Sequence, residues 1–408
     1  MLTTVRNTPP DAPCFPEVGV LGLVPDDWDG NWQPRHQVLS RLSRYFNVVW
    51  VSPAQELWAR SGHGGTPVPP PRESLGPNLT VYKAGKLLPR LYRPAFLASF
   101  LSRLRLKKAK QLLSDRGCRK VILYLWRPEY AEAVDLINPE LTCYHIDDEY
   151  SFSELEQPLS ESEALLISRV DQVFIHSRAL LEKKGDLNRH TRFVPNGVDY
   201  RAYATPVAEP EDLVTIPHPR IGYTGILKRQ LDWPLLFFLV KRHTELSFIF
   251  VGPQSSHPEV PDFIANLSKR RNVYFLGAKS VRDLAAYPQH FDVCVMPYQR
   301  NDYTKYIYPL KLHEYLASGR PVVGTGIRSL YDFADVIALA NSPEQWSMAI
   351  CNALGSEANA AEQRMKRQAV ARKHDWEILV EEIAKTMVMR LGFSDSAVPQ
   401  ELHASTAL

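Results

Sequence analysis

The stretch YPLKLHEYLASGRPVV, Tyr308–Val323, combines a short helix with the start of a buried strand. Proline is well tolerated in the first turn of a helix, where its missing N–H would have no partner in any case, so Pro309 marks a helix start. Gly319 and Pro321 mark its end, and the β-branched pair Val322–Val323 begins a strand. The stretch therefore predicts a helix followed closely by a buried strand, as in an α/β domain.

Two charged residues on this helix indicate a ligand site. Lys311 and Glu314 are three residues apart, so they share one helical face. The N-terminus of a helix attracts anions because its first N–H groups have no partner within the helix. A cation and a carboxylate one turn further suit a ligand that carries both phosphate and hydroxyl groups, such as a nucleotide sugar. The alternative is an exposed ion pair that would contribute at most about 0.5 kcal/mol.

Short apolar runs alternate with amphipathic segments along the whole chain, and these runs are the expected strands. They are Val18–Val24, Val48–Val51, Val121–Leu125, Cys143–Ile146, Val173–His176, Arg220–Tyr223, Phe248–Val251, Val273–Leu276, Val293–Met296 and Val322–Val323. Continuous apolar runs are typical of parallel sheets that helices cover on both faces. The sequence therefore predicts two doubly wound α/β domains in succession, with ligands bound at the carboxyl ends of the strands.

Further segments, together with Tyr308–Val323, carry a family resemblance. They are FVPNGVD (Phe193–Asp199), IGYTGIL (Ile221–Leu227), FIFVGP (Phe248–Pro253), NVYFLGA (Asn272–Ala278) and DVCVMPY (Asp292–Tyr298). The second half of the chain resembles GT-B glycosyltransferases, especially family-4-like enzymes (glycosyl transferases group 1), and the first half resembles them loosely. The resemblance implies two Rossmann-like domains that face a central cleft, with the acceptor on the first domain and the nucleotide sugar on the second.

The resemblance also implies the domain limits and one departure from the family. We expect an acceptor domain over 1–205, a donor domain over 206–361, one helical segment over 362–391 that crosses back to the first domain, and a tail over 392–408. Glu314 matches the glutamate that binds the donor ribose. The family has a second glutamate eight positions earlier, facing the transferred sugar, and this chain has Tyr306 there.

Other residues of the second domain are candidates for donor binding. Gly225 follows an expected strand, and a glycine there lets the backbone approach a phosphate. Lys228 would stabilise a departing diphosphate together with Lys311. Arg229 is the other candidate for the role given to Lys228. The alternative for this loop is an ordinary solvated turn. Tyr298 and Tyr306 would pack on the sugar or nucleotide, although such aromatic residues also serve in the core.

In the first domain, CYHIDDEY places Asp147 and Asp148 at the carboxyl end of an expected strand. An inverting transfer needs a base for the proton of the acceptor hydroxyl, and we assign this catalytic role to Asp147. The alternative is an N-cap for the following helix. Arg35 and His36, within NWQPRHQ, are candidates for contact with an acceptor phosphate, and His36 could equally lie on a helix surface.

Positive charge is concentrated in residues 83–120, which contain twelve Lys or Arg and one acid, Asp115. The charges alternate with apolar residues: Leu87, Leu88, Leu91, Phe96, Leu97, Phe100, Leu101 and Leu104. This composition is typical of a helix that binds an anionic membrane surface. The alternative is an ordinary surface helix whose apolar side packs on its own domain.

Composition narrows the class of protein. The chain has 408 residues, 45% of them hydrophobic and 23% charged, as in globular proteins. Its net charge of +3 is too small to indicate nucleic-acid binding. The five cysteines show no CxxC pair, and we find neither a membrane span nor the apolar core of a signal peptide. We therefore expect a cytoplasmic protein, held at the inner face of the cytoplasmic membrane if residues 83–120 bind lipid.

The sequence predicts a metal-independent, hexosyltransferase-like enzyme without a cofactor. It would move a sugar from a nucleoside-diphosphate sugar to a saccharide, lipid-linked in our interpretation, during bacterial surface polysaccharide or glycolipid synthesis. The missing glutamate and Asp147 favour inversion. Two alternatives remain: a non-catalytic GT-B scaffold or partner subunit, and a nucleotide-sugar epimerase on the same fold.

Overall fold

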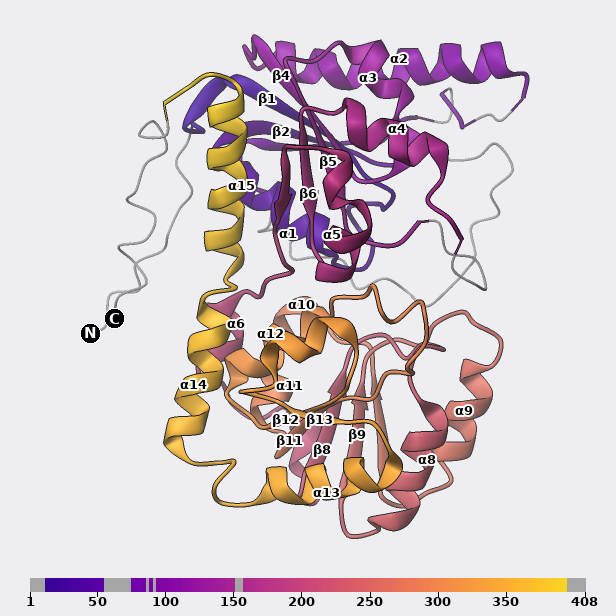
Figure 1. Ribbon diagram of the computed structural model, residues 1–408, viewed down its shortest axis with the longest axis vertical. Helices are drawn as coiled ribbons and strands as arrows, with labels where there is room; N and C mark the ends of the chain where they lie inside the picture. Colours follow the sequence, from indigo (N-terminus) through magenta and orange to yellow (C-terminus); the bar gives the residue numbers. More distant parts are fainter. Residues whose placement is uncertain (1–11, 55–74, 86–87, 91–92, 151–156, 395–408) are drawn as a thin grey trace.

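The computed structural model describes residues 12–54, 75–85, 88–90, 93–150 and 157–394 and contains two parallel sheets, one above the other (Figure 1). The first sheet has the order β3-β2-β1-β4-β5-β6-β7 and the second has the order β10-β9-β8-β11-β12-β13. All strand pairs in both sheets are parallel. The doubly wound fold class that the sequence predicts is confirmed.

The strands keep the chain order of the predicted apolar runs. In the first sheet they are β1 Phe15–Leu23, β2 Phe46–Val51, β3 Leu79–Tyr82, β4 Lys120–Leu125, β5 Leu141–Ile146, β6 Gln172–Ile175 and β7 Thr191–Phe193. In the second they are β8 Arg220–Thr224, β9 Ser247–Val251, β10 Val273–Gly277, β11 Val293–Met296, β12 Val322–Thr325 and β13 Ala338–Ala340. Sequence reasoning missed β3, β7 and β13. All three are short edge strands with partly exposed residues, so none forms a continuous apolar run.

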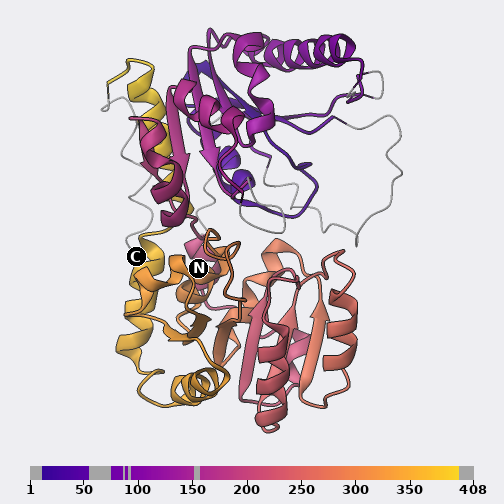
Figure 2. The same ribbon diagram turned by 45° about the vertical axis from the view of Figure 1, so that its right-hand side comes forward.

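Helices cover both faces of the first sheet (Figures 1 and 2). One face packs against α1 Pro34–Leu42 and against α15 Trp376–Arg390, which comes from the far end of the chain. The other face packs against four helices: α2 Ala95–Ser114, α3 Glu132–Ile137, α4 Glu161–Arg169 and α5 Arg178–Lys184. We call this sheet with these helices the first domain. Lys86, Leu87 and Leu91 of the predicted basic segment lie outside the described residues, as does 395–408 of the predicted tail.

The second domain has one large hydrophobic core around its sheet. Its helices are α6 Tyr200–Ala204, α7 Glu211–Val214, α8 Trp233–Arg242, α9 Val260–Leu267, α10 Val281–Leu284, α11 Ala286–Gln289, α12 Leu310–Ser318, α13 Pro343–Leu354 and α14 Ala361–Arg372. Short 3-10 helices occur in both domains: η2 Pro128–Tyr130 and η3 Gly185–Leu187 in the first, and η4 Arg328–Phe333 in the second.

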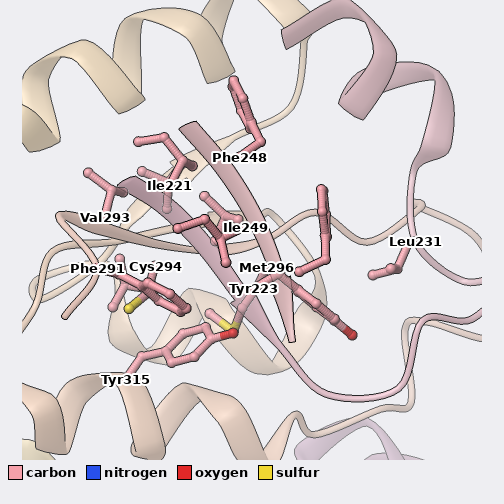
Figure 3. Close-up of a cluster of buried hydrophobic side chains, with 14 of the residues drawn as sticks. Ile221, Tyr223, Leu231, Phe248, Ile249, Phe291, Val293, Cys294, Met296 and Tyr315 are labelled. Atoms are coloured by element: carbon pink, nitrogen blue, oxygen red, sulfur yellow. The ribbon is translucent and has the colours of Figure 1, made fainter. Parts of the chain in front are cut away.

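The helix predicted from Tyr308–Val323 is α12, and a buried tyrosine fixes it to the sheet. Gly319 ends α12 in the left-handed conformation, with φ of 76°. Tyr315 packs among the strand residues of the core (Figure 3), and its hydroxyl accepts a 2.8 Å hydrogen bond from the backbone N–H of Thr224 at the end of β8. The position of α12 relative to the end of β8 is therefore set by a buried polar contact.

The single helical segment expected over 362–391 is two helices, α14 and α15, with a break at 373–375. At the break the N–H of Val198 donates to the carbonyl of His374, and the N–H of Trp376 donates to the carbonyl of Val198, both at 2.9 Å. Asp375 then caps α15 by accepting from the N–H of Glu377. These backbone contacts with the chain between the domains compete with the helical hydrogen bonds, and the periodicity of the sequence does not reveal them.

A buried ion cluster supports the segment that follows β5. The Lys184 ammonium group is fully buried and lies 3.0 Å from Glu149 Oε1 and 2.8 Å from Glu163 Oε1. Lys183 lies 3.1 Å from Glu149 Oε2, and the Tyr144 hydroxyl donates to Glu163. Because Glu149 directly follows Asp148, this cluster fixes the chain at the end of β5.

We predict that Lys184→Met lowers the free energy of unfolding by about 3–5 kcal/mol, because it leaves two buried carboxylates without their shared cation. The urea midpoint of unfolding, compared with that of wild type, measures the effect. Lys366→Met is the matched control, since Lys366 forms an exposed ion pair with Glu362 and its loss should cost less than about 1 kcal/mol. Equal midpoints for both variants would contradict the role given to the cluster.

Candidate functional site

A cavity of about 730 Å³ lies between the two domains and is lined by residues that follow the strands of both sheets. We call it the cleft cavity. From the first domain it is lined by Arg35, Arg127, Asp147, Asp148 and His176, among others, and from the second by Gly225, Lys228, Gly252, Tyr298, Lys311 and Glu314. It thus brings together seven of the predicted site residues. The other two, His36 and Tyr306, do not line it.

Two glycines form one wall of the cleft cavity. Gly225 has φ of +124° and Gly252 has φ of +149°, conformations that side chains rarely adopt. A Cβ on Gly252 would lie 2.1 Å from the carbonyl oxygen of Gly225, so the loops after β8 and β9 are in direct contact. A Cβ on Gly225 would lie 3.3 Å from the Lys311 ammonium group. Bare backbone therefore borders the cationic part of the cavity.

Lys228 and Lys311 give this wall two positive charges, and neither lysine forms an ion pair within the described part of the chain. The Lys311 ammonium group donates a 2.9 Å hydrogen bond to the Tyr298 hydroxyl and lies 4.9 Å from the centre of the Tyr223 ring. Burial, together with the charge of Lys311, lowers the pKa of Lys228 to about 8. Such a pair of cations is suited to binding an anion with several charges.

This arrangement also bears on two of the predicted roles. Lys311 does not form the exposed ion pair with Glu314 that was the alternative, because it is hydrogen-bonded to Tyr298 instead. Tyr298 lines the cleft cavity but is buried, and its hydroxyl holds Lys311 in place. The predicted packing of Tyr298 on a ligand stays a prediction.

Glu314 lies next to the lysine pair, one turn further along α12. Burial raises the pKa of Glu314, and the nearby charge of Lys311 and a hydrogen bond from the Tyr203 hydroxyl offset this only in part. Tyr203 comes from α6 and is itself buried. A carboxylate held in this way beside cations can accept hydrogen bonds from ligand hydroxyl groups.

The two aspartates after β5 differ in their contacts. Asp147 accepts hydrogen bonds from the Arg35 guanidinium group on one oxygen and from the Tyr150 hydroxyl on the other. Burial acts to raise the pKa of Asp147, but these two partners outweigh it, so the pKa lies below its ordinary value. Arg35 also pairs with Asp26. These contacts suit Asp147 to holding Arg35 rather than to accepting a proton.

Asp148 is better suited than Asp147 to accept a proton. Burial and the adjacent negative charge of Asp147 raise the pKa of Asp148 above its ordinary value. One of its carboxylate oxygens accepts from the N–H of Glu149, and the other has no partner within the described residues. Its side chain lines the cleft cavity.

His36 and Tyr306 lie away from the cavity. His36 is fully buried and packs on aromatic rings of the first domain, so its position does not fit the predicted acceptor contact or a helix surface. Tyr306 is 2% exposed and belongs to the hydrophobic core of the first domain, although its loop comes from the second. The predicted contact of Tyr306 with the donor therefore does not fit its position either.

Sequence reasoning missed several cavity residues. Arg127 follows β4 and His176 follows β6, so the strand-end rule that was applied to Asp147 would have identified both. Gly252 could have been found in the same way, within FIFVGP. Tyr203, which contacts Glu314 without lining the cleft cavity, gave no such signal, because it comes from a helix that is distant in sequence. Among the described residues, no group of three or more His, Cys, Asp or Glu is arranged to hold a metal ion.

We predict that a nucleoside diphosphate, the ligand class that Lys311 and Glu314 indicate, binds less tightly as the pH rises through about 8. The lowered pKa means that Lys228 is cationic below this value and neutral above it, and only the cationic form attracts phosphate. Isothermal titration between pH 7 and 9.5 measures the affinity. Lys228→Arg should remove the pH dependence, because arginine stays charged throughout this range. A wild-type affinity that does not change with pH would exclude Lys228 from the anion site.

Comparison with known proteins identifies similar sequences. Residues 218–356 match the family model described as Glycosyl transferases group 1. A curated relative, the putative teichuronic acid biosynthesis glycosyltransferase TuaH of Bacillus subtilis (strain 168), is 27% identical over 243 residues. The match covers 56% of this chain and 59% of the relative, so the chain spans little more than half of that protein.

Solved structures match nearly the whole chain. Anabaena Alr3699/HepE in complex with UDP and glucose has a TM-score of 0.63 and 15% identity, covering 90% of this chain and 98% of that one. Sucrose-phosphate synthase from Thermosynechococcus elongatus has a TM-score of 0.67 and 15% identity, covering 92% and 99%. At such identities these structures establish the fold. The chain has the GT-B fold, and its second domain matches the Glycosyl transferases group 1 model.

Proposed function

We propose that this protein is a glycosyltransferase that moves a sugar from a nucleoside-diphosphate sugar to a saccharide acceptor. The observation that carries the proposal is the Lys228–Lys311 pair, which forms no ion pair within the described residues, beside Glu314 on one wall of the cleft cavity. A nucleoside diphosphate presents its groups in the same order, with a doubly charged diphosphate next to ribose hydroxyls. The lysines bind the diphosphate, and Glu314 binds the ribose.

The comparisons support this class of reaction. The matched family model and the name of the Bacillus subtilis relative both specify glycosyl transfer, and the HepE structure contains UDP and glucose. The relative's name also refers to teichuronic acid biosynthesis. We therefore assign the acceptor to a saccharide of bacterial surface polysaccharide or glycolipid synthesis. The further proposal that it is carried on a lipid rests on the basic segment that includes α2.

The two lysines supply the positive charge that the leaving group needs. As the bond from the sugar to the diphosphate breaks, negative charge develops on the diphosphate oxygen, and fixed cations in a partly buried site stabilise it. This role requires no metal ion, so we propose metal-independent transfer.

We assign the base for the acceptor hydroxyl to Asp148, with Asp147 as the residue that positions Arg35. In this step the acceptor oxygen bonds to the anomeric carbon, its proton passes to the Asp148 carboxylate, and the sugar–diphosphate bond breaks. The free oxygen of Asp148 and its raised pKa support this role. A single displacement of this kind inverts the anomeric centre. The absence of a carboxylate at position 306 agrees with it.

We predict that Glu314→Gln and Asp148→Asn separate donor binding from transfer. Glu314→Gln should weaken binding of the donor tenfold or more, because hydrogen bonds to a charged group contribute about 1.5–3 kcal/mol. Asp148→Asn should keep donor affinity and lower the rate of transfer about 100-fold or more. A panel of UDP-, GDP-, ADP- and dTDP-sugars, tested for binding and for slow hydrolysis, measures both effects.

The outcomes also distinguish the alternatives. Donor binding without hydrolysis or transfer would favour the non-catalytic scaffold, and conversion of the donor to another nucleotide sugar would indicate an epimerase. If no donor binds to wild type, or if Glu314→Gln binds as wild type does, the proposal is wrong. Retention of the anomeric configuration in the product would exclude the base role of Asp148.

We further propose that α2 binds an anionic membrane surface. Phe96 and Phe100 are 76% and 55% exposed, and Arg103, Lys107 and Lys108 are exposed on the same helix, which contains no acidic residue. The helix lies at the end of the first domain that is farthest from the second domain (Figures 1 and 2). Exposed aromatic and basic residues together favour anionic lipid. No described helix is both long and apolar enough to cross a bilayer.

We predict that the double variant Lys107→Glu/Lys108→Glu lowers binding to phosphatidylglycerol vesicles at least tenfold, since each basic residue near such a surface contributes about 1 kcal/mol. Co-sedimentation with phosphatidylglycerol and with phosphatidylcholine vesicles measures it. Phe96→Ser/Phe100→Ser should also weaken binding. Met348→Ser, which alters an exposed apolar residue of the second domain, should have no effect. Equal binding of wild type to both lipids would contradict the proposal.

A further inference from the structure

A second cavity, of about 690 Å³, joins the cleft cavity between the two domains. The residues that line both cavities define the boundary between them: Trp32, Gln33, Val281, Leu284, Leu310 and Glu314. Trp32 and Gln33 belong to the first domain, just before α1. Val281 and Leu284 belong to α10 of the second domain, so both domains form the boundary.

The residues that line one or both cavities show which groups lie next to this boundary. Lys228, Lys311 and Gly225 line the cleft cavity alone, whereas Glu314 lines both cavities. Glu314 therefore marks a point at which the lysine-lined cavity meets the boundary. Apart from Glu314 and Gln33, the side chains at the boundary are apolar or aromatic. A ligand that places an anion at the lysines and hydroxyls at Glu314 would meet apolar surface beyond them.

The Trp32 ring is held in place from inside the first domain. Its centre lies 4.7 Å from the His36 ring, with an interplanar angle of 27°, and 5.5 Å from the Trp28 ring. His36 is fully buried and packs in turn against Trp50, with the two ring centres 4.4 Å apart. Burial lowers the pKa of His36 to about 4, so its ring is neutral at ordinary pH. One part of Trp32 is thus supported by an aromatic cluster, while another part faces the cavities.

We infer that Trp32 stacks on the nucleobase of the donor, against Val281 and Leu284 on the opposite domain. This inference rests on the proposed function, because a nucleoside diphosphate carries its flat aromatic base directly beyond the ribose. A partly exposed indole that rigid neighbours hold is a suitable platform for such a base. The first domain then contacts the donor as well as the acceptor, and the two domains bind the nucleotide jointly. His36 contributes as a positioning residue that supports Trp32.

The test compares nucleoside diphosphates with a ligand that has no base. UDP, GDP, ADP and dTDP are titrated into wild type, Trp32→Ala, Trp32→Leu and Trp32→Phe, with inorganic pyrophosphate as the base-free control. Trp32→Ala should weaken binding of the nucleotide that wild type prefers about 10- to 100-fold, the range observed for stacking of one base on an aromatic side chain. Trp32→Phe should keep most of the affinity. Trp32→Leu, which is apolar but cannot stack, should behave like Trp32→Ala.

Pyrophosphate should bind equally to all four proteins, because it reaches only the lysines. An equal loss for pyrophosphate and nucleotide would show that Trp32 acts through the shape of its loop, and this would overturn the inference. Unchanged nucleotide binding by Trp32→Ala would also overturn it, while leaving the proposed function intact. Failure of every nucleoside diphosphate to bind wild type would overturn the proposed function as well.

Discussion

The parallel connection of the strands is the constraint on which the site depends. Parallel neighbours require a crossover, so every strand of a sheet ends at the same edge, and in this protein the ends of both sheets border one cavity. Residues that are distant in sequence, such as Asp148 after β5 and Gly225 after β8, thereby line the same cavity. The backbone groups and charges that the proposed reaction needs lie at these ends.

The electrostatics of the cavity are set by which charges have partners. Arg35 and Asp147 neutralise each other, and the buried cluster around Lys184 is likewise paired. Lys228 and Lys311 have no such carboxylate partner within the described residues. Placing two cations close together in a partly buried site costs free energy in the absence of a ligand, as the lowered pKa of Lys228 indicates. A bound diphosphate would remove this cost.

Contacts between the domains fix how the two halves of the site face each other. Tyr306 from the second domain is buried in the core of the first. Two ion pairs join α5 to η4, Arg178 with Asp332 at 2.5 Å and Glu182 with Arg328 at 2.6 Å. The two C-terminal helices also join the domains: α14 packs on the second domain, and α15, which follows it in the chain, packs on the first (Figure 1). Position 306 thus provides a contact between the two domains.

The sequence by itself determined the two doubly wound domains, the helix from Pro309 to Gly319, and the placement of Lys228, Lys311 and Glu314 in one cavity. These features follow from local patterns, because strand ends and helix faces are fixed by residues close in sequence. Only the tertiary structure decided which of these groups have partners. It paired Asp147 with Arg35, buried His36 and Tyr306, and brought Tyr203 to Glu314. Each of these contacts joins segments whose meeting depends on the packing of whole domains, and such packing leaves no periodic signal in the chain.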